Sequence, residues 1–167
     1  KAVEAQGFEA IERSAGAETG EGPTVWALRE VARRRRILVL CGSIAERVDD
    51  PGKTANTSVL LGDDGSILAS YRKIHLFDVN IPDGARYAES ETVLPGDRPV
   101  VAATPLGRVG LTVCYDLRFP ELYRRLAEQG AEIVTIPAAF TLYTGKDHWE
   151  VLVRARAVEN LCYVVAP

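Results

Sequence analysis

The chain has 167 residues, a net charge of −3 and 47% hydrophobic residues, enough apolar material for the core of one domain. Charges of both signs are mixed along the sequence, which argues against a nucleic-acid-binding protein because such domains are normally basic. Arg33 to Arg36 form the one basic cluster, and we expect it to be the solvated end of a helix. No apolar run reaches the roughly 18 residues of a membrane span, and no signal peptide is visible. We therefore expect neither a nucleic-acid partner nor a membrane partner.

The three cysteines, Cys41, Cys114 and Cys162, are far apart in the sequence. They form no CxxC pair, and the two histidines add little, so the sequence offers no zinc site. Cys41 and Cys162 lie inside apolar runs, where we expect buried thiols. An odd number of free thiols is typical of a reducing compartment, so we expect a cytoplasmic protein.

Helix, strand and hairpin signals follow one another in the first half of the chain. Pro23 suits a first helical turn, and Val25, Leu28 and Ala32 recur at helical spacing. The β-branched residues that begin at Thr54 are followed by Asp-Asp-Gly, which is a strong hairpin signal. These signals predict a helix at 23–35, strands at 37–46, 54–62 and 66–73, and a long, functional loop at 74–99.

The second half begins with another hairpin and then alternates helix with strand. Gly130 ends the helix after the hairpin, and Trp149, Leu152, Val153 and Ala157 share one face of the last helix. Such an order predicts a single α/β domain, in which helices pack on a mixed sheet. The predicted elements are strands at 99–105 and 108–114, a helix at 119–130, a strand at 131–137, a loop at 138–147, a helix at 148–160 and a strand at 161–167.

Cys114 is the first candidate for chemistry, because it stands where an apolar strand ends and a charged helix begins. A thiol attacks as the thiolate, and its usual pKa is about 8.5, so the site would need a base or a nearby cation. At a strand end the thiol would lie at the rim where α/β proteins place ligands. Backbone N–H groups just after the strand can face a developing oxyanion. The alternative is a small hydrophobic residue that closes the strand.

Lys73 is the second candidate, at the end of a predicted strand and just before the long loop. Its compact charge suits the stabilisation of an anionic intermediate, and a surface lysine is the alternative. The carboxylates of Glu89 and Glu91 lie in the loop, where solvated side chains are the default.

Several other polar residues near these two candidates are expected to have structural roles. We expect a satisfied structural histidine at position 75, and packing roles for His148 and Trp149 at the start of the last helix. The last three residues are charged, and we expect them to pair with each other at the surface, where such pairs contribute little to stability. They are Asp116, Arg118 and Glu121.

Four stretches of the sequence resemble the nitrilase, or carbon–nitrogen hydrolase, superfamily. They are YRKIHLFD, ESETVLPG, GLTVCYDLRFPELYRRLAEQGAEIVTIPAAFT and TGKDHWEVLVRARAVENLCYVV, and shorter matches extend the resemblance over essentially the whole chain. The resemblance implies an α/β fold of the nitrilase-like α-β-β-α sandwich type, with mixed sheets covered by helices. It also implies a homodimer that binds a small-molecule amide and needs no metal or organic cofactor.

The same resemblance implies a catalytic set. Cys114 corresponds to the nucleophile, Lys73 to the residue that stabilises the oxyanion, and Glu89 to a second, assisting glutamate. Tyr115 would supply a backbone N–H to the oxyanion. Positions near the substrate pocket correspond to Arg118, Glu121, Phe140 and Thr141, and Arg154 and Arg156 lie on a helix that supports the site and forms the dimer.

The implied reaction cleaves a small linear amide to an acid and ammonia through a cysteine thioester. The family's base glutamate ends its first long strand, and we expect it upstream of Lys1, because Glu4 has no apolar strand before it. The chain contains no Met and stops just after an apolar run, so we expect both ends to be cut from a longer chain. Residues 1–167 would then be one partial domain, without the first strand and the C-terminal part, and nearly or fully inactive alone.

Within the family, the motifs are most similar to amidases of deaminated glutathione. Amidases of the ω-amides of 2-oxo acids are the alternative. A non-catalytic binding relative with the same fold stays open as a second class. A structural or redox thiol protein is a third class, against which the isolated position of Cys114 argues.

Overall fold

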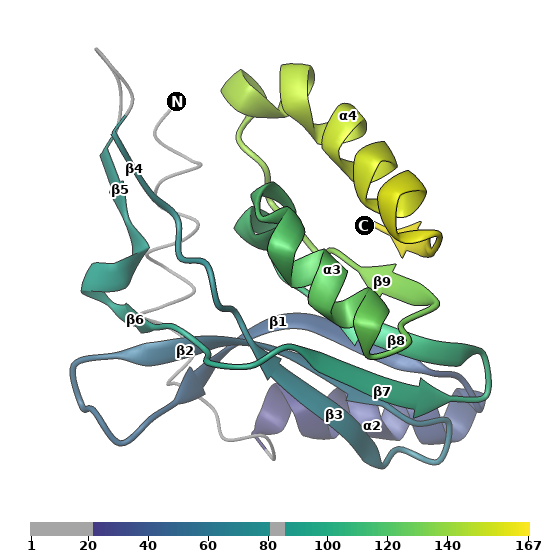
Figure 1. Ribbon diagram of the computed structural model, residues 1–167. Coiled ribbons are helices and arrows are strands. Elements are labelled where there is room, and N and C mark those ends of the chain that lie inside the picture. Colours follow the sequence, from purple (N-terminus) through teal and green to yellow (C-terminus); the bar gives the residue numbers. More distant parts are fainter. Residues whose placement is uncertain (1–21, 81–85) are drawn as a thin grey trace.

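Two β-sheets, a short β-ribbon and three α-helices make up most of the residues that the computed structural model describes, 22–80 and 86–167 (Figure 1). The helices are α2 (Pro23–Arg35), α3 (Pro120–Glu128) and α4 (Leu142–Asn160), with short 3-10 helices η1 (Glu89–Glu91) and η2 (Cys114–Arg118). The strands are β1 (Val39–Arg47), β2 (Thr54–Leu61), β3 (Ile67–Arg72), β4 (Asp78–Asn80), β5 (Arg86–Ala88), β6 (Val93–Leu94), β7 (Val100–Thr104), β8 (Gly107–Leu111), β9 (Ile133–Thr135) and β10 (Tyr163–Val165).

The first sheet has the strand order β1-β2-β3, and its neighbouring strands run antiparallel. β6 pairs in parallel with the start of β2. One face is covered by α2, whose Val25 and Ala32 are fully buried against Cys41, Val59 and Leu61. The helical spacing of these residues predicts α2 correctly, and the helix ends where three arginines occupy its last turn.

The second sheet has the strand order β10-β9-β8-β7. β7 and β8 form an antiparallel hairpin, whereas β8, β9 and β10 run parallel. Each parallel step needs a crossover, and α3 and α4 supply these two connections. Both helices lie on the side of the molecule opposite to α2 (Figure 1).

The two sheets contribute side chains to one core. Leu60 and Tyr71 of the first sheet belong to the same buried cluster as Val109, Leu111 and Leu126 of the second sheet and its covering helix. The structure therefore confirms a mixed α/β fold, in which hairpins come first and helix–strand alternation follows. A complete four-layer sandwich is not evident from the described residues.

The long segment predicted as a loop is more regular than expected. It contains β4, β5, η1 and β6. Asp78 and Ala88 are paired across the β4–β5 ribbon, and the Asp78 carboxylate accepts a hydrogen bond from the backbone N–H of Ser90 at 3.0 Å. Strands of two or three residues are too short to give an alternating pattern, so the sequence prediction was wrong here.

Two predicted boundaries are also wrong. α4 begins at Leu142 rather than at His148, and a backbone hydrogen bond from Gly145 to Thr141 at 2.7 Å belongs to its first turns. A glycine inside a helix costs only about 1 kcal/mol, so tertiary context can override this local signal. The strand expected to run to Cys114 ends at Leu111, and Cys114 opens the turn η2. No helix in the described part of the chain is long and apolar enough to cross a membrane.

Candidate active site

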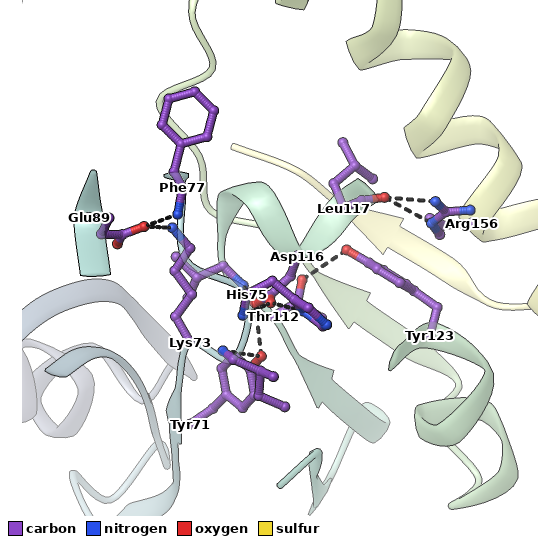
Figure 2. Close-up of polar contacts among 12 residues, drawn as sticks. Tyr71, Lys73, His75, Phe77, Glu89, Thr112, Asp116, Leu117, Tyr123 and Arg156 are labelled. Atoms are coloured by element: carbon purple, nitrogen blue, oxygen red, sulfur yellow. Dashed lines mark hydrogen bonds and ion pairs between the residues drawn. The ribbon is translucent and has the colours of Figure 1, made fainter. Parts of the chain in front are cut away.

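The site is built around a buried ion pair between Lys73 and Glu89. Lys73 follows directly after β3, and its Nζ lies 2.5 Å from Oε2 of Glu89, which stands at the start of η1 (Figure 2). The Lys73 side chain is 3% exposed and that of Glu89 is 13% exposed. A charged side chain this deeply buried is costly unless it is paired, and the carboxylate of Glu89 supplies the partner. The surface-lysine alternative for Lys73 is thereby excluded.

Glu89 is fixed from several directions. Its Oε2 also accepts a hydrogen bond from the backbone N–H of Phe77 at 2.6 Å, and its Oε1 accepts one from Nδ2 of Asn56 at 3.2 Å. Asn56 is held in turn by a short hydrogen bond from the hydroxyl of Ser43. The default expectation of a solvated Glu89 is therefore wrong, because three donors converge on this carboxylate.

Cys114 lies just beyond the C-terminal end of β8 in the second sheet, and its backbone conformation is strained. Its φ angle is 48°, and its N–H donates to the carbonyl of Pro137, just beyond β9, at 2.9 Å. Arg36 and Leu161 also have positive φ angles, but both cap helix ends, where this conformation is common. Cys114 caps no helix, and such strain is often retained where it aims a functional side chain.

Burial and neighbouring charges act on the Cys114 thiol in opposite directions. Burial raises the pKa of the thiol, whereas the ammonium of Lys73 and a hydrogen bond with the backbone of Ala139 lower it. The carboxylates of Glu89 and Asp116 add to the rise. The thiol is therefore protonated at rest, and a base must remove its proton before the sulfur can attack.

The structure brings Cys114, Lys73 and Glu89 into one electrostatically coupled group. The thiol and the ammonium come from different sheets, and the carboxylate comes from the segment between them. In such an arrangement the nucleophile can add to a carbonyl carbon, and the buried cation can stabilise the oxyanion that forms. The described residues contain no group of three or more His, Cys, Asp and Glu side chains that could hold a metal ion.

Asp116 is placed differently from the surface pair that the sequence predicts. Its side chain is fully buried, and Oδ1 lies 2.7 Å from Nδ1 of His75. The prediction was wrong because the turn η2 directs this carboxylate into the core rather than towards Arg118. The structural role expected for His75 is confirmed, since its ring also stacks on Phe119 with a centroid distance of 3.7 Å.

Arg118 belongs to an aromatic and basic group beside the site. Its guanidinium lies 5.2 Å from the ring centre of Phe140 and 5.8 Å from that of Tyr115, and its Nη1 lies 3.2 Å from Nδ1 of His148. Phe140 in turn packs on Trp149 at 4.8 Å. Phe140, Thr141 and Trp149 line a cavity together with Ala138, Gly145, Lys146, Ala166 and Pro167.

Glu121 is not brought into this group. It is exposed on the first turn of α3. Arg154 is also exposed, and it pairs with Glu150 one helical turn away. These two residues therefore have no contact that would link them to Cys114 among the interactions of the described chain.

Arg156 supports the turn that carries Cys114. It is 5% exposed, and its Nε and Nη2 donate to the carbonyl oxygen of Leu117 in η2 at 3.0 and 2.8 Å (Figure 2). Nη1 pairs with Glu159 at 2.8 Å, and the guanidinium lies 5.2 Å from the ring centre of Tyr123. α4 thus fixes η2 through one buried side chain.

Sequence reasoning missed three residues that shape the site, Asn56, Tyr71 and Asp116. Asn56 holds Glu89, and Tyr71 donates from its hydroxyl to Asp116 at 2.8 Å. Asn56 stands among the polar residues Thr54, Thr57 and Ser58 in the first half of β2, so no local signal indicated its role. Glu4, considered for the base, lies outside the described residues.

Comparison with known proteins identifies a family whose members share this arrangement of the chain. A family model described as carbon-nitrogen hydrolase matches residues 5–167. Deaminated glutathione amidase from Synechocystis sp. is 52% identical over 143 residues, which cover 84% of this chain and 53% of that protein. The omega-amidase NIT2 of Homo sapiens is 47% identical over 148 residues, which cover 89% of this chain and 53% of that protein. The chain thus spans about half the length of the curated relatives it matches.

A solved structure extends the similarity to the fold. It shows a variant of the amidase from Nesterenkonia sp. AN1 after Michael addition of acrylamide at the active-site cysteine. Its TM-score with this chain is 0.70 at 32% sequence identity, and the match covers 85% of this chain and 52% of that one. With a family model that covers almost its whole length, the chain belongs to the carbon–nitrogen hydrolase, or nitrilase, superfamily.

Proposed function

We propose that the protein is an amidase that hydrolyses a small linear amide through a thioester on Cys114. One observation carries the proposal: the buried ammonium of Lys73, paired with Glu89, acts electrostatically on the Cys114 thiol. A structural thiol needs no such partner, and a lysine is rarely buried without a specific reason. The similarity to amidases of the same family supports this assignment.

In the proposed mechanism, the sulfur of Cys114 adds to the amide carbon while a glutamate base accepts the thiol proton. Lys73 and the backbone N–H of Tyr115 stabilise the oxyanion. The base then passes the proton to the leaving nitrogen, the C–N bond breaks, and ammonia departs from a thioester. Water attacks the thioester with the help of the same base, the C–S bond breaks, and the proton returns to sulfur. The products are the acid, ammonia and the free thiol.

Glu89 is not the base in this mechanism. Its carboxylate already accepts hydrogen bonds from Lys73, Phe77 and Asn56. These donors occupy the oxygen lone pairs through which the carboxylate would accept a proton from the thiol. We assign to Glu89 the task of holding the Lys73 side chain in place, and we assign proton transfer to a glutamate outside the described residues.

For the substrate, we propose deaminated glutathione. The similarity to deaminated glutathione amidase of Synechocystis supports this choice. An ω-amide of a 2-oxo acid is the second candidate, and it is favoured by the 47% identity to an omega-amidase. The basic and aromatic group around Arg118 supports a substrate with a negatively charged end, which both candidates have.

We also propose that the complete protein is a homodimeric α-β-β-α sandwich that works in the cytoplasm. Exposed apolar side chains on α4 and just after it, Val151, Val158 and Leu161, support a covering partner. Neither Cys114 nor Cys162 forms a disulfide in the part of the chain that the structure describes, which supports a reducing compartment.

The test is ammonia release by the full-length protein that carries this chain, with each of the two substrates in turn. We expect a higher kcat/KM for deaminated glutathione than for the 2-oxo acid ω-amide, and no turnover after Cys114→Ala. Mass spectrometry of the quenched reaction should find the acyl group on the peptide that contains Cys114. Full turnover by Cys114→Ala would refute the thioester mechanism, and binding of both amides without ammonia release would favour a non-catalytic relative.

A further inference from the structure

The carboxylate of Asp116 is fully buried and accepts hydrogen bonds on both oxygens. Oδ2 accepts from the hydroxyl of Tyr71 at 2.8 Å and from the backbone N–H of Val113 at 2.9 Å. Oδ1 accepts from the backbone N–H of His75 at 3.1 Å and lies 2.7 Å from its Nδ1 (Figure 2). A buried charge is costly unless its hydrogen bonds are satisfied, and these donors satisfy it.

The donors come from the two segments that carry the reacting groups. Tyr71 and His75 stand two positions before and two positions after Lys73. Val113 directly precedes Cys114, and Asp116 itself lies in the turn that Cys114 opens. One carboxylate therefore joins the end of the first sheet's β3 segment to the turn that follows β8 of the second sheet.

We propose that Asp116 is a positioning residue that keeps the Cys114 thiol in register with the Lys73 ammonium. The inference rests on the proposed function, in which these two groups act on the same amide. The carboxylate touches neither the substrate nor the reacting atoms. It acts by connecting the two backbone segments, each of which is otherwise tied to its own sheet.

The other backbone contacts of the reacting residues explain why such a connection is needed. The N–H of Lys73 donates to the carbonyl of Asn56 at 2.8 Å, within the first sheet. The N–H of Cys114 donates to the carbonyl of Pro137 at 2.9 Å, beside the second sheet. Apolar packing between the sheets resists separation but is weakly directional, whereas hydrogen bonds fix direction and distance. The strained φ of 48° at Cys114 also requires surroundings that hold the turn in place.

The first test is Asp116→Asn in the full-length enzyme. The amide group has one oxygen instead of two, so one backbone N–H, of Val113 or of His75, loses its acceptor. We expect kcat to fall about a hundredfold, because a displacement of about 1 Å has that effect, while KM stays nearly unchanged. If Asp116 had a purely structural role, the substitution would lower the free energy of unfolding but would not lower kcat selectively while KM stays unchanged.

A second readout follows the geometry directly and needs no substrate. The rate at which iodoacetamide alkylates Cys114 is measured against pH, with and without Lys73→Gln. In the wild type, Lys73→Gln should raise the pKa of the thiol, because the ammonium lowers it. In Asp116→Asn the same change should shift that pKa by less than half as much. An unreduced shift together with wild-type kcat would overturn the proposal.

A matched pair of tyrosines covers the case in which Asp116→Asn fails to fold. Tyr71 and Tyr123 are both fully buried in the same core cluster, and each hydroxyl makes a buried side-chain hydrogen bond. Only Tyr71 bonds to Asp116; the hydroxyl of Tyr123 lies 3.1 Å from that of Thr112. We expect Tyr71→Phe to lower kcat about tenfold and Tyr123→Phe to leave it within twofold, as expected if smaller displacements cost less. Equal losses of kcat in the two variants would overturn the proposal.

The alkylation experiment separates this inference from the proposed function. If the wild type hydrolyses no amide but Asp116→Asn still weakens the effect of Lys73 on the thiol, the positioning role stands and the amidase assignment fails. If the wild type is an amidase and neither Asp116→Asn nor Tyr71→Phe changes kcat, the positioning role fails alone.

Discussion

Nζ of Lys73 lies 2.5 Å from Oε2 of Glu89, and both side chains are almost withdrawn from water. Removing one partner of such a pair leaves an uncompensated buried charge, which is strongly destabilising. The pair also presents two opposite charges to the Cys114 thiol, one lowering and one raising its pKa. The two partners should therefore have separable effects on the sulfur.

Neutral substitutions at Lys73 and Glu89 should move the pKa of the Cys114 thiol in opposite directions. Lys73→Gln removes the positive charge that favours the thiolate, so the pKa rises further. Glu89→Gln removes a negative charge that disfavours the thiolate, so the pKa falls. The measurement is the pH dependence of iodoacetamide alkylation of Cys114, followed by mass spectrometry of its peptide.

Lys53→Gln is the matched control for this experiment. Lys53 lies directly before β2 of the first sheet, and its Nζ donates to the carbonyl of Ser90 at 3.0 Å rather than pairing with Glu89. This variant should leave the thiol's pKa unchanged. A shift in the same direction for Lys73→Gln and Glu89→Gln would contradict the electrostatic account of the site.

Replacement of Cys114 should reveal the strain in its backbone. With φ at 48°, alanine retains the strain, whereas glycine adopts this conformation freely. We expect Cys114→Gly to have a free energy of unfolding at least as high as Cys114→Ala, measured by urea denaturation.

Cys41, in the interior of β1, supplies the opposite case. It has no positive φ, so Cys41→Gly should be less stable than Cys41→Ala by about 1 kcal/mol. If the glycine variant were less stable than the alanine variant by a similar free energy of unfolding at both Cys41 and Cys114, the backbone strain at Cys114 would not affect stability.

Arg156→Lys should destabilise the fold far more than Arg154→Lys. Arg156 is buried and places two nitrogens on the carbonyl oxygen of Leu117, a geometry that an ammonium cannot reproduce. Losing these charged hydrogen bonds should cost about 2 kcal/mol of unfolding free energy. Arg154 forms an exposed pair with Glu150, so its replacement should cost below about 0.5 kcal/mol. Urea denaturation of both variants checks the difference, and similar losses would show that η2 does not depend on Arg156.

Gly96→Ala should disturb the strand end that carries Lys73. A Cβ at Gly96 would lie 2.2 Å from the carbonyl oxygen of Arg72. The backbone N–H of Gly96 donates to the carbonyl oxygen of Lys73 at 2.8 Å. Because the obstructing atom is backbone, we expect a loss of about 2–3 kcal/mol in unfolding free energy and a lower kcat. Gly52→Ala is the control, since its nearest neighbour is Oδ1 of Asp50 at 3.4 Å, and it should stay within about 0.5 kcal/mol of the wild type. A wild-type melting temperature for Gly96→Ala would mean that this loop moves aside freely.

Strong local patterns predicted the regular parts of the fold. α2 was predicted at its observed bounds from Pro23 and a helical apolar stripe, and the β2–β3 and β7–β8 hairpins were predicted from their turns. The start of α4 was missed because Gly145 and the threonines before it are typical of a loop, and no side chain caps the helix at Thr141. Tertiary context overrides such a weak local preference, and a single sequence does not show tertiary context.

Part of the candidate site could also be predicted from the sequence, and part could not. Resemblance to the family indicated Cys114, Lys73 and Glu89, and the structure places them together, while their roles stay predictions. The surroundings of Asp116 were not predictable, because its partners Tyr71 and His75 are more than 40 positions away in the sequence. Hydrogen bonds between segments so far apart leave no local pattern, so only the tertiary structure distinguishes this aspartate from a surface one.

The layer of side chains between the two sheets has a consequence for protein engineering. One sheet carries the ammonium and the other carries the thiol, so in the proposed amidase the thickness of this layer would set the gap across which the substrate fits. Leu60 and Val109 belong to the layer and touch neither group's reactive atom in any interaction described above. If the proposed function holds, enlarging or trimming these two core side chains would change that gap and, with it, the acyl chains that the site accepts.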